Sequence, residues 1–180
     1  MIGHSAAARL WLMRGAYVGL ALVIFAFRLL PLNMTPPTWA GPDLLLAITF
    51  AWALRRPDYV PALSVALVML MADLLFQRPP GLWAALAVIA TAMLKARARG
   101  LRDQTFAMEW LNVAIMIVAT VLGYRLILSL AMVPQAPIGL TAIRAFMTVL
   151  VYPLAVAFSA LVFGVRKAAP GEVDATGQGA

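Results

Sequence analysis

Asp43 and Asp73 are the residues of this 180-residue sequence best placed to do chemistry, because each carboxylate adjoins a long apolar stretch. A charged side chain inside a bilayer is costly and therefore needs a structural or functional reason. Two close carboxylates could support an aspartyl mechanism, as in an intramembrane protease, although no motif flanks this pair. HExxH, GxSxG and phosphate-loop patterns are missing from the sequence. We therefore expect no enzyme.

Metal and cofactor chemistry have few candidate ligands. The sequence contains no cysteine and one histidine, His4, close to the amino terminus. The lack of thiols excludes disulfides, iron–sulfur clusters and thiolate zinc sites. A single histidine cannot supply the three or four ligands of a zinc site. We expect neither a metal nor a cofactor.

The composition indicates which solvent surrounds these carboxylates. Hydrophobic residues make up 64% of the chain and charged residues 12%, and the mean hydropathy is +0.93. Soluble domains are about 45–50% apolar and about 25% charged, and a chain of this size could not bury so much apolar surface. The sequence therefore predicts a polytopic membrane protein of the all-α class.

Six membrane spans are predicted from apolar runs near the length of about 20 residues that a spanning helix needs. Proline-containing breaks separate most of them, because proline removes a helix donor or sets a turn. The second and fourth spans are short. The predicted spans are Trp11–Leu32, Asp43–Leu54, Tyr59–Phe76, Leu82–Ala96, Phe106–Met132 and Thr141–Phe163. Residues 1–167 would form one helical domain, and residues 168–180 a disordered cytoplasmic tail.

The distribution of basic residues predicts the orientation of the bundle. Cytoplasmic loops of membrane proteins collect Lys and Arg, and ten of the fourteen basic residues fall on one predicted side: Arg9, Arg14, Arg55, Arg56, Lys95, Arg97, Arg99, Arg102, Arg166 and Lys167. Both termini are therefore expected in the cytoplasm. The net charge of +7 is explained by these loops, so no nucleic-acid partner is expected.

Six charged residues gather toward the opposite, outer leaflet: Arg28, Asp43, Asp73, Arg78, Arg125 and Arg144. Such residues usually face the bundle interior, pair with one another or mark a functional surface. Arg28 and Arg144 could instead extend to the lipid headgroups. Asp73 could pair with Arg78 or Arg125 as a structural tie. Arg125 is the deepest of the arginines.

Two features of the predicted cytoplasmic side have structural interpretations. The basic loop Lys95, Arg97, Arg99 and Arg102 would fix the topology and contact anionic lipid at about 1 kcal/mol per basic residue, or dock a cytoplasmic partner. Glu109, early in the fifth span, could meet this loop in a tie between helices.

The stretch from Pro42 to Trp83 resembles the rod shape-determining protein MreD family. The resemblance rests on Asp73 followed by Pro80-Gly81, on Pro42-Asp43-Leu44-Leu45-Leu46, on Trp52 in a short helix, and on Arg55-Arg56-Pro57. That family often has glycine four residues before the aspartate and four residues after it, whereas this chain has Met69 and Gln77. Chain length and span count also agree with the family.

The resemblance implies a fold similar to the six-helix substrate-binding component of energy-coupling-factor transporters. It implies a non-enzymatic scaffold of the cell-elongation complex in the bacterial inner membrane, with an MreC-like single-span partner, MreB filaments, and the RodA–transpeptidase pair that builds peptidoglycan. Asp73 and Arg78 would form a hinge at the outer ends of the third and fourth helices. Small residues on the fifth helix (Ala114, Ala119, Gly123) could pack against the partner's span or within the bundle.

A second function remains open from the same residues. A substrate-binding component of a vitamin-type transporter would need an outward cavity lined by Arg28, Asp43, Asp73, Arg125 and Arg144. It would also need a stripe of small residues on the first helix for coupling, which Gly15 and Gly19 resemble weakly.

Overall fold

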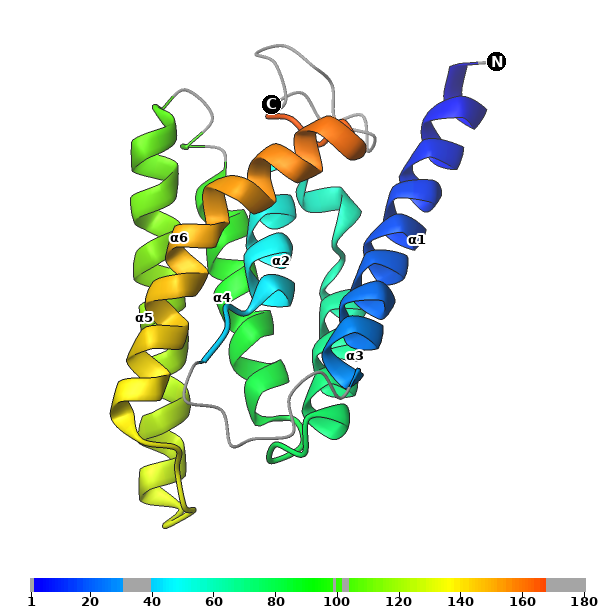
Figure 1. The fold of residues 1–180 in the computed structure, drawn as a ribbon. Helices are drawn as coiled ribbons and strands as arrows, with labels where there is room; N and C mark the ends of the chain where they lie inside the picture. The colour runs from blue at the N-terminus through cyan, green and yellow to red at the C-terminus, as the bar shows by residue number, and fades with distance from the viewer. Residues whose placement is uncertain (1, 31–39, 99, 102–103, 168–180) are drawn as a thin grey trace.

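The computed structural model describes residues 2–30, 40–98, 100–101 and 104–167 (Figure 1). These residues form helices and no strand, which confirms the predicted all-helical fold for this part of the chain. The elements are α1 (Ile2–Leu29), α2 (Leu44–Arg55), the 3-10 turn η1 (Pro57–Tyr59), α3 (Ala62–Leu75), α4 (Leu82–Ala98), α5 (Phe106–Leu130) and α6 (Ile138–Val162). The predicted tail 168–180, and Arg99 and Arg102 of the basic loop, lie outside the described residues.

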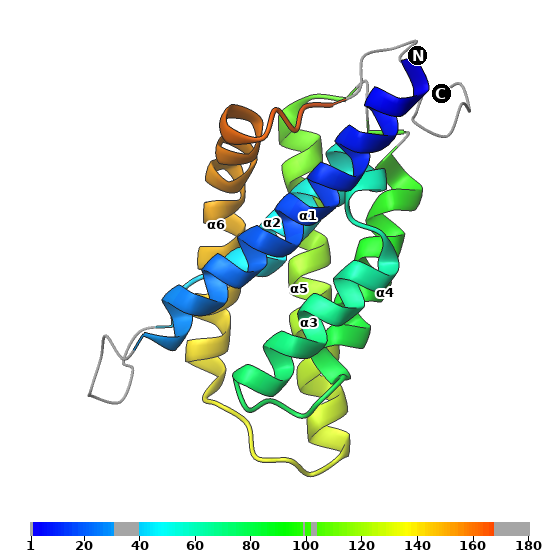
Figure 2. The same ribbon diagram turned by 90° about the vertical axis from the view of Figure 1, so that its right-hand side faces the viewer.

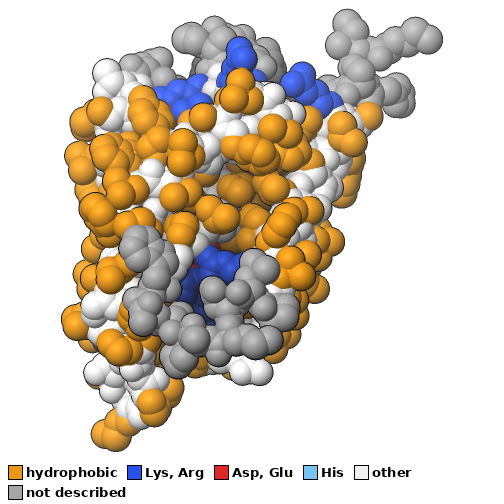
Figure 3. Space-filling model, in the orientation of Figure 1, with side chains coloured by type: hydrophobic (Ala, Val, Ile, Leu, Met, Phe, Trp, Pro, Cys, Tyr) orange, Lys and Arg blue, Asp and Glu red, His pale blue; other side chains and the backbone are white. Residues whose placement is uncertain are grey.

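Three helices contain segments long and apolar enough to cross a membrane: Ala7–Leu29, Phe106–Leu130 and Ile138–Val162. The helices α2 and α3 are apolar but shorter, and α4 has 17 residues. The number of spans therefore stays a prediction. Large apolar side chains cover much of the surface, as expected of a protein surrounded by lipid (Figure 3).

Helix boundaries differ from the predicted spans where helix-forming tendency and hydropathy diverge. The first helix begins at Ile2 rather than Trp11, because Ala6-Ala7-Ala8 favours helix without being required to cross lipid. The third begins at Ala62 rather than Tyr59, since η1 and Pro61 occupy the intervening residues. The sixth begins at Ile138, directly after Pro137.

The central element of the bundle is the short helix α2. It packs against α6, α4, η1 and α1, and every residue from Leu45 to Leu54 is buried. A helix that is apolar all round is expected in such a core position. With 12 residues it is about 18 Å long, which is shorter than the bilayer core of about 30 Å. Figure 2 shows α1 lying across α2.

The two ends of the bundle differ in charge. In both ribbon views α1 begins and α6 finishes at the same end (Figures 1 and 2). We name it the Glu109 end, after Glu109 and its partners Arg55 and Lys167. The opposite end holds the α3–α4 and α5–α6 loops and is named the Asp43 end, after Asp43, Arg78, Arg125 and Arg144. Lys and Arg side chains line the edge of the Glu109 end, and others lie in a hollow nearer the opposite end (Figure 3).

A left-handed residue closes α3. The N–H of Arg78 donates to the carbonyl of Asp73 at 2.9 Å, and the N–H of Gln77 donates to that of Leu74 at 3.3 Å. This pairing is the Schellman motif, in which the residue after the cap takes a positive φ and is usually glycine. Here the residue is Gln77, with φ of 52°.

Replacing Gln77 with glycine should stabilise the protein by roughly 0.5–1 kcal/mol, because a side chain in the left-handed region costs about 1–2 kcal/mol and glycine gives part of this back as chain entropy. Thermal unfolding of the purified protein, followed by helical circular dichroism, measures the change. Gln77→Ala keeps the Cβ atom and should leave the unfolding midpoint within error. A Gln77→Gly midpoint at or below that of Gln77→Ala would contradict the assignment.

Candidate functional site

Asp43 joins three parts of the chain at the start of α2. Its Oδ1 accepts from the N–H of Leu46 at 3.2 Å, so Asp43 is the N-cap of the helix. Its own N–H donates to Thr148 Oγ1 on α6 at 2.9 Å. Its Oδ2 lies 2.8 Å from Arg144 Nη2 and 3.9 Å from Arg78 Nη2. The predicted placement of Asp43 inside the helix is thus corrected by one residue.

Arg28 reaches the same cluster from α1. Its guanidinium donates to the carbonyl of Pro42, the residue before Asp43. Four of the six charges predicted at the outer leaflet therefore converge on the start of α2: Arg28, Asp43, Arg78 and Arg144. Arg144 is not extended to the headgroups as a lone side chain, because it pairs with Asp43.

Asp73 caps α4 and does not pair with an arginine. Its Oδ2 accepts from the N–H groups of Gly81 and Ala84, both at 3.1 Å, across the turn that contains Pro80. Gly81 has φ of +88°, a conformation that glycine adopts readily. Among the described residues Asp73 makes no ion pair, so the predicted pairing with Arg78 or Arg125 is wrong.

Arg78 belongs to the Asp43 cluster through its side chain, and its backbone N–H donates to the carbonyl of Asp73 at 2.9 Å. Its guanidinium lies over the rings of Phe76 and Trp83, at 5.4 and 5.3 Å from their centroids. Burial, and then the charge of Arg144, lower the pKa of the Arg78 guanidinium below its ordinary value. The aromatic rings and Asp43 hold this cation in place of water.

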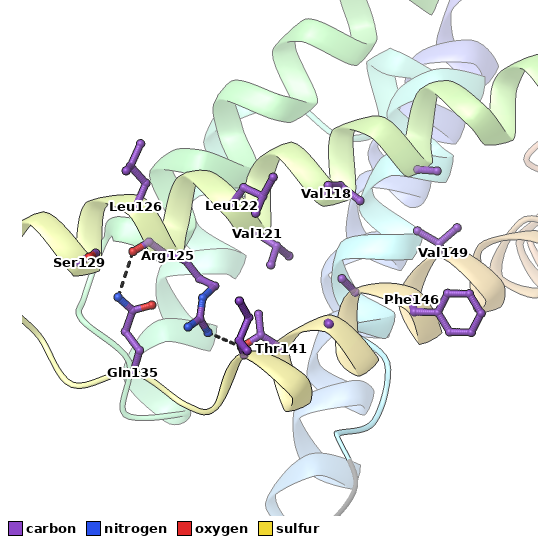
Figure 4. Close-up of a pocket in the computed structure, with 14 residues that line it drawn as sticks. Val118, Val121, Leu122, Arg125, Leu126, Ser129, Gln135, Thr141, Phe146 and Val149 are labelled. Atoms are coloured by element: carbon purple, nitrogen blue, oxygen red, sulfur yellow. Dashed lines mark hydrogen bonds between the residues drawn. The ribbon is translucent and has the colours of Figure 1, made fainter.

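Arg125 links α5 to the loop that follows it. Its Nη1 donates to the carbonyl of Ala136 at 3.0 Å and to Thr141 Oγ1 at 2.7 Å. Gln135 Nε2 donates to the carbonyl of Arg125 at 3.0 Å (Figure 4). The partners of Arg125 in the described part of the chain are therefore neutral.

Glu109 forms a second buried cluster. Its side chain is 1% exposed. Arg55 at the end of α2 donates to both oxygens, at 3.1 and 3.3 Å, Lys167 lies 3.1 Å from Oε2, and Tyr152 donates to Oε1 at 2.8 Å. Glu109 is thus a tie between helices, and its partners among the described residues lie on α2, α6 and the segment after α6. Lys167 also donates to the carbonyls of Leu101 and Gln104 in the loop after α4.

The described part of the basic loop is also structural. The ammonium group of Lys95 donates to the carbonyl of Val60, after η1, while Arg97 is exposed. Of the small residues on α5, a Cβ at Gly123 would lie 3.7 Å from Leu86 of α4. Gly123 therefore packs within the bundle, and Ala119 is exposed.

Two hollows open near the Asp43 end. One has a volume of about 470 Å³ and contains the three arginines Arg78, Arg125 and Arg144 in its lining, with aromatic and polar neighbours. The other is a groove of about 780 Å³ between α5 and α6, almost wholly apolar (Figure 4). Asp43 and Asp73 line neither hollow. In the described ranges no three His, Asp or Glu side chains come together as a metal-binding group.

Comparison of the chain with models of protein families, with curated proteins and with solved structures finds no match.

Replacing Glu109 with glutamine should destabilise the protein by roughly 3 kcal/mol, because it leaves two cations without a carboxylate in a buried setting. Asp58→Asn is the matched control: the Asp58 carboxylate makes no ion pair within the described residues and acts on Lys95 only at longer range, so this change should cost about 1 kcal/mol or less. Thermal unfolding followed by circular dichroism compares the two. Equal midpoints for the two variants would show that Glu109 does not hold the cluster together.

Proposed function

We propose that the chain is a non-enzymatic integral-membrane scaffold of the MreD kind, acting in the cell-elongation complex of a bacterial inner membrane. The observation that carries the proposal is the closed turn formed by Asp73, Pro80 and Gly81. These are the residues on which the resemblance chiefly rests, and the carboxylate and the glycine are joined by a hydrogen bond of 3.1 Å. This turn needs a carboxylate at position 73 to accept the hydrogen bond and a glycine at position 81 to take the positive φ.

The residue that departs from the family pattern supports the same proposal. Gln77 has φ of 52°, a conformation in which glycine is preferred, and glycine is what the family often has at this position. The backbone at position 77 therefore has the conformation that glycine favours, although the side chain here is glutamine.

The contacts of the buried carboxylates also support a scaffold function. Asp43, Asp73 and Glu109 each bind backbone N–H groups or side chains of other helices. Groups bound in this way fix helix positions. Of the three carboxylates, Asp73 keeps one oxygen, Oδ1, that is buried and has no hydrogen-bond partner in the described structure. The proposed partner is an MreC-like single-span protein, with MreB filaments and the RodA–transpeptidase pair in the same complex.

The proposed topology places both termini in the cytoplasm and the Asp43 end outside. The chain contains no cysteine, so single substitutions give clean labelling sites. In intact cells, Val133→Cys should react with a membrane-impermeant maleimide and Gly100→Cys should react only after the cells are opened. Labelling of position 100 in intact cells would overturn the orientation.

Purification of the tagged chain in mild detergent should recover a single-span protein with a coiled-coil region, identified by mass spectrometry. Asp73→Ala removes the acceptor for Gly81 and Ala84 and should reduce this recovery severalfold at equal expression, whereas Asp73→Asn keeps an accepting oxygen and should retain it. Failure of the wild-type chain to recover such a partner would overturn the scaffold. Full recovery by Asp73→Ala would overturn only the role of Asp73.

A second candidate function, a substrate-binding transporter component, is favoured by one observation. The arginine-lined hollow of about 470 Å³ falls in the range of about 300–1,000 Å³ typical of small-molecule sites. In addition, nothing lies within 4 Å of a Cβ at Gly15 or Gly19, so this stripe is open to a coupling partner. A water-soluble ligand retained through purification would favour this function over the scaffold.

A further inference from the structure

The two hollows at the Asp43 end adjoin each other. Both are lined by Val121, Arg125, Gln135 and Thr141. Figure 4 shows Arg125 reaching toward Thr141 at one end of the groove, while Val118, Phe146 and Val149 lie toward the other. A single elongated molecule could therefore place a polar group against the arginines and an apolar chain between α5 and α6.

The charge at the polar end calls for an anion. Arg78, Arg125 and Arg144 line the smaller hollow, and its lining contains no acidic residue. Asp43 lies behind Arg144 and Arg78 and offsets one positive charge. Arg125 has only neutral hydrogen-bond partners in the described chain. Uncompensated cations at membrane depth are costly, and the guanidinium fork matches phosphate geometry.

Gln135 adds a second requirement. Because its Nε2 donates to the carbonyl of Arg125, the amide orientation is set and Oε1 is the remaining acceptor. This Oε1 is buried and has no hydrogen-bond partner in the described structure. A buried acceptor without a donor costs about 1–3 kcal/mol. A hydroxyl donor beside the phosphate of the occupant would satisfy this acceptor once the Gln135 side chain turns toward the hollow.

The length of the groove suits an acyl chain. Its lining on α5 runs from Ala114 to Ser129, about 22 Å at 1.5 Å per residue, which matches one leaflet of about 20–22 Å including headgroups. Its almost wholly apolar lining is suited to the chain of a lipid.

We infer that these two adjoining hollows together bind one acidic phospholipid with a hydroxylated headgroup, of which phosphatidylglycerol is the simplest. The phosphate lies against Arg125 and Arg144, the headgroup hydroxyl donates to Gln135 Oε1, and one acyl chain fills the α5–α6 groove. The inference goes beyond the scaffold function and does not depend on it.

Native mass spectrometry of the purified full chain tests the site with phosphatidylglycerol and phosphatidylcholine of identical acyl chains. The wild-type chain should retain one phosphatidylglycerol at concentrations at least tenfold below those needed for phosphatidylcholine. Arg125→Gln, which removes the charge, and Ala142→Phe, which fills the groove, should each weaken phosphatidylglycerol retention at least tenfold. Circular dichroism verifies that both variants keep the wild-type helicity.

Matched controls separate the site from general effects of charge and bulk. Arg9→Gln removes an exposed arginine elsewhere, and Leu154→Phe enlarges an exposed side chain of α6 outside the groove; both should retain the lipid as the wild type does. Equal retention of the two lipids by the wild type would overturn the inference. It would also be overturned if millimolar inorganic phosphate displaced the headgroup while Ala142→Phe had no effect, because a site for a free anion would then explain the arginines.

Discussion

The shortness of α2 is the constraint on which the rest of the structure depends. A helix leaves four N–H groups and four carbonyls unpaired at its ends, and in lipid these groups must be satisfied within the protein. A spanning helix places its ends in water or headgroups. At 12 residues, α2 is shorter than the bilayer core, and Asp43 and Leu54 at its two ends are buried in the bundle, so other side chains must take the place of water.

A carboxylate lies at each end of α2, and the two act differently. At the amino end, Asp43 caps the helix and binds Arg144, with a negative charge where the helix dipole favours one. At the carboxyl end, the N–H of Arg56 donates to the carbonyl of Trp52, Arg55 lies in the last turn, where a cation is favourable, and Glu109 neutralises Arg55 from α5. The partners of both carboxylates come from different helices, so the groups at the ends of α2 also fix the helices around it.

The sequence was sufficient to predict the elements and the sidedness of the charges, but not the pairing. Apolar run length and proline breaks located all six helices, because hydropathy and turn chemistry are local properties. Arg28, Arg78 and Arg144 were placed at one leaflet by span direction alone. Their common partner, Asp43, was not identified because the predicted helix included it. In the structure Asp43 precedes the helix, and this shift of one residue turns its side chain toward Arg144. The cluster around Glu109 could have been predicted in a similar way. The cytoplasmic ends of the second, fifth and sixth predicted spans lie on one side of the bundle, which brings Arg55, Glu109 and Lys167 to that side.

The arginines at the Asp43 end differ in how firmly they are bound within the protein, and this difference decides which of them can bind a ligand. Arg28 and Arg78 are committed, the first to the carbonyl before α2 and the second to aromatic rings and Asp43. Drawing either one toward a ligand would leave Asp43 less compensated, and breaking a buried pair is strongly destabilising. Arg144 is partly exposed, at 30% of its side chain, and Arg125 is bonded only to neutral groups. A ligand can therefore engage Arg125 without loosening the start of α2, and it can approach the exposed side of Arg144 while that residue keeps its bond to Asp43. A site used in this way binds its occupant at the side of a fixed bundle, which suits a lipid held from the surrounding membrane better than a solute carried through the centre.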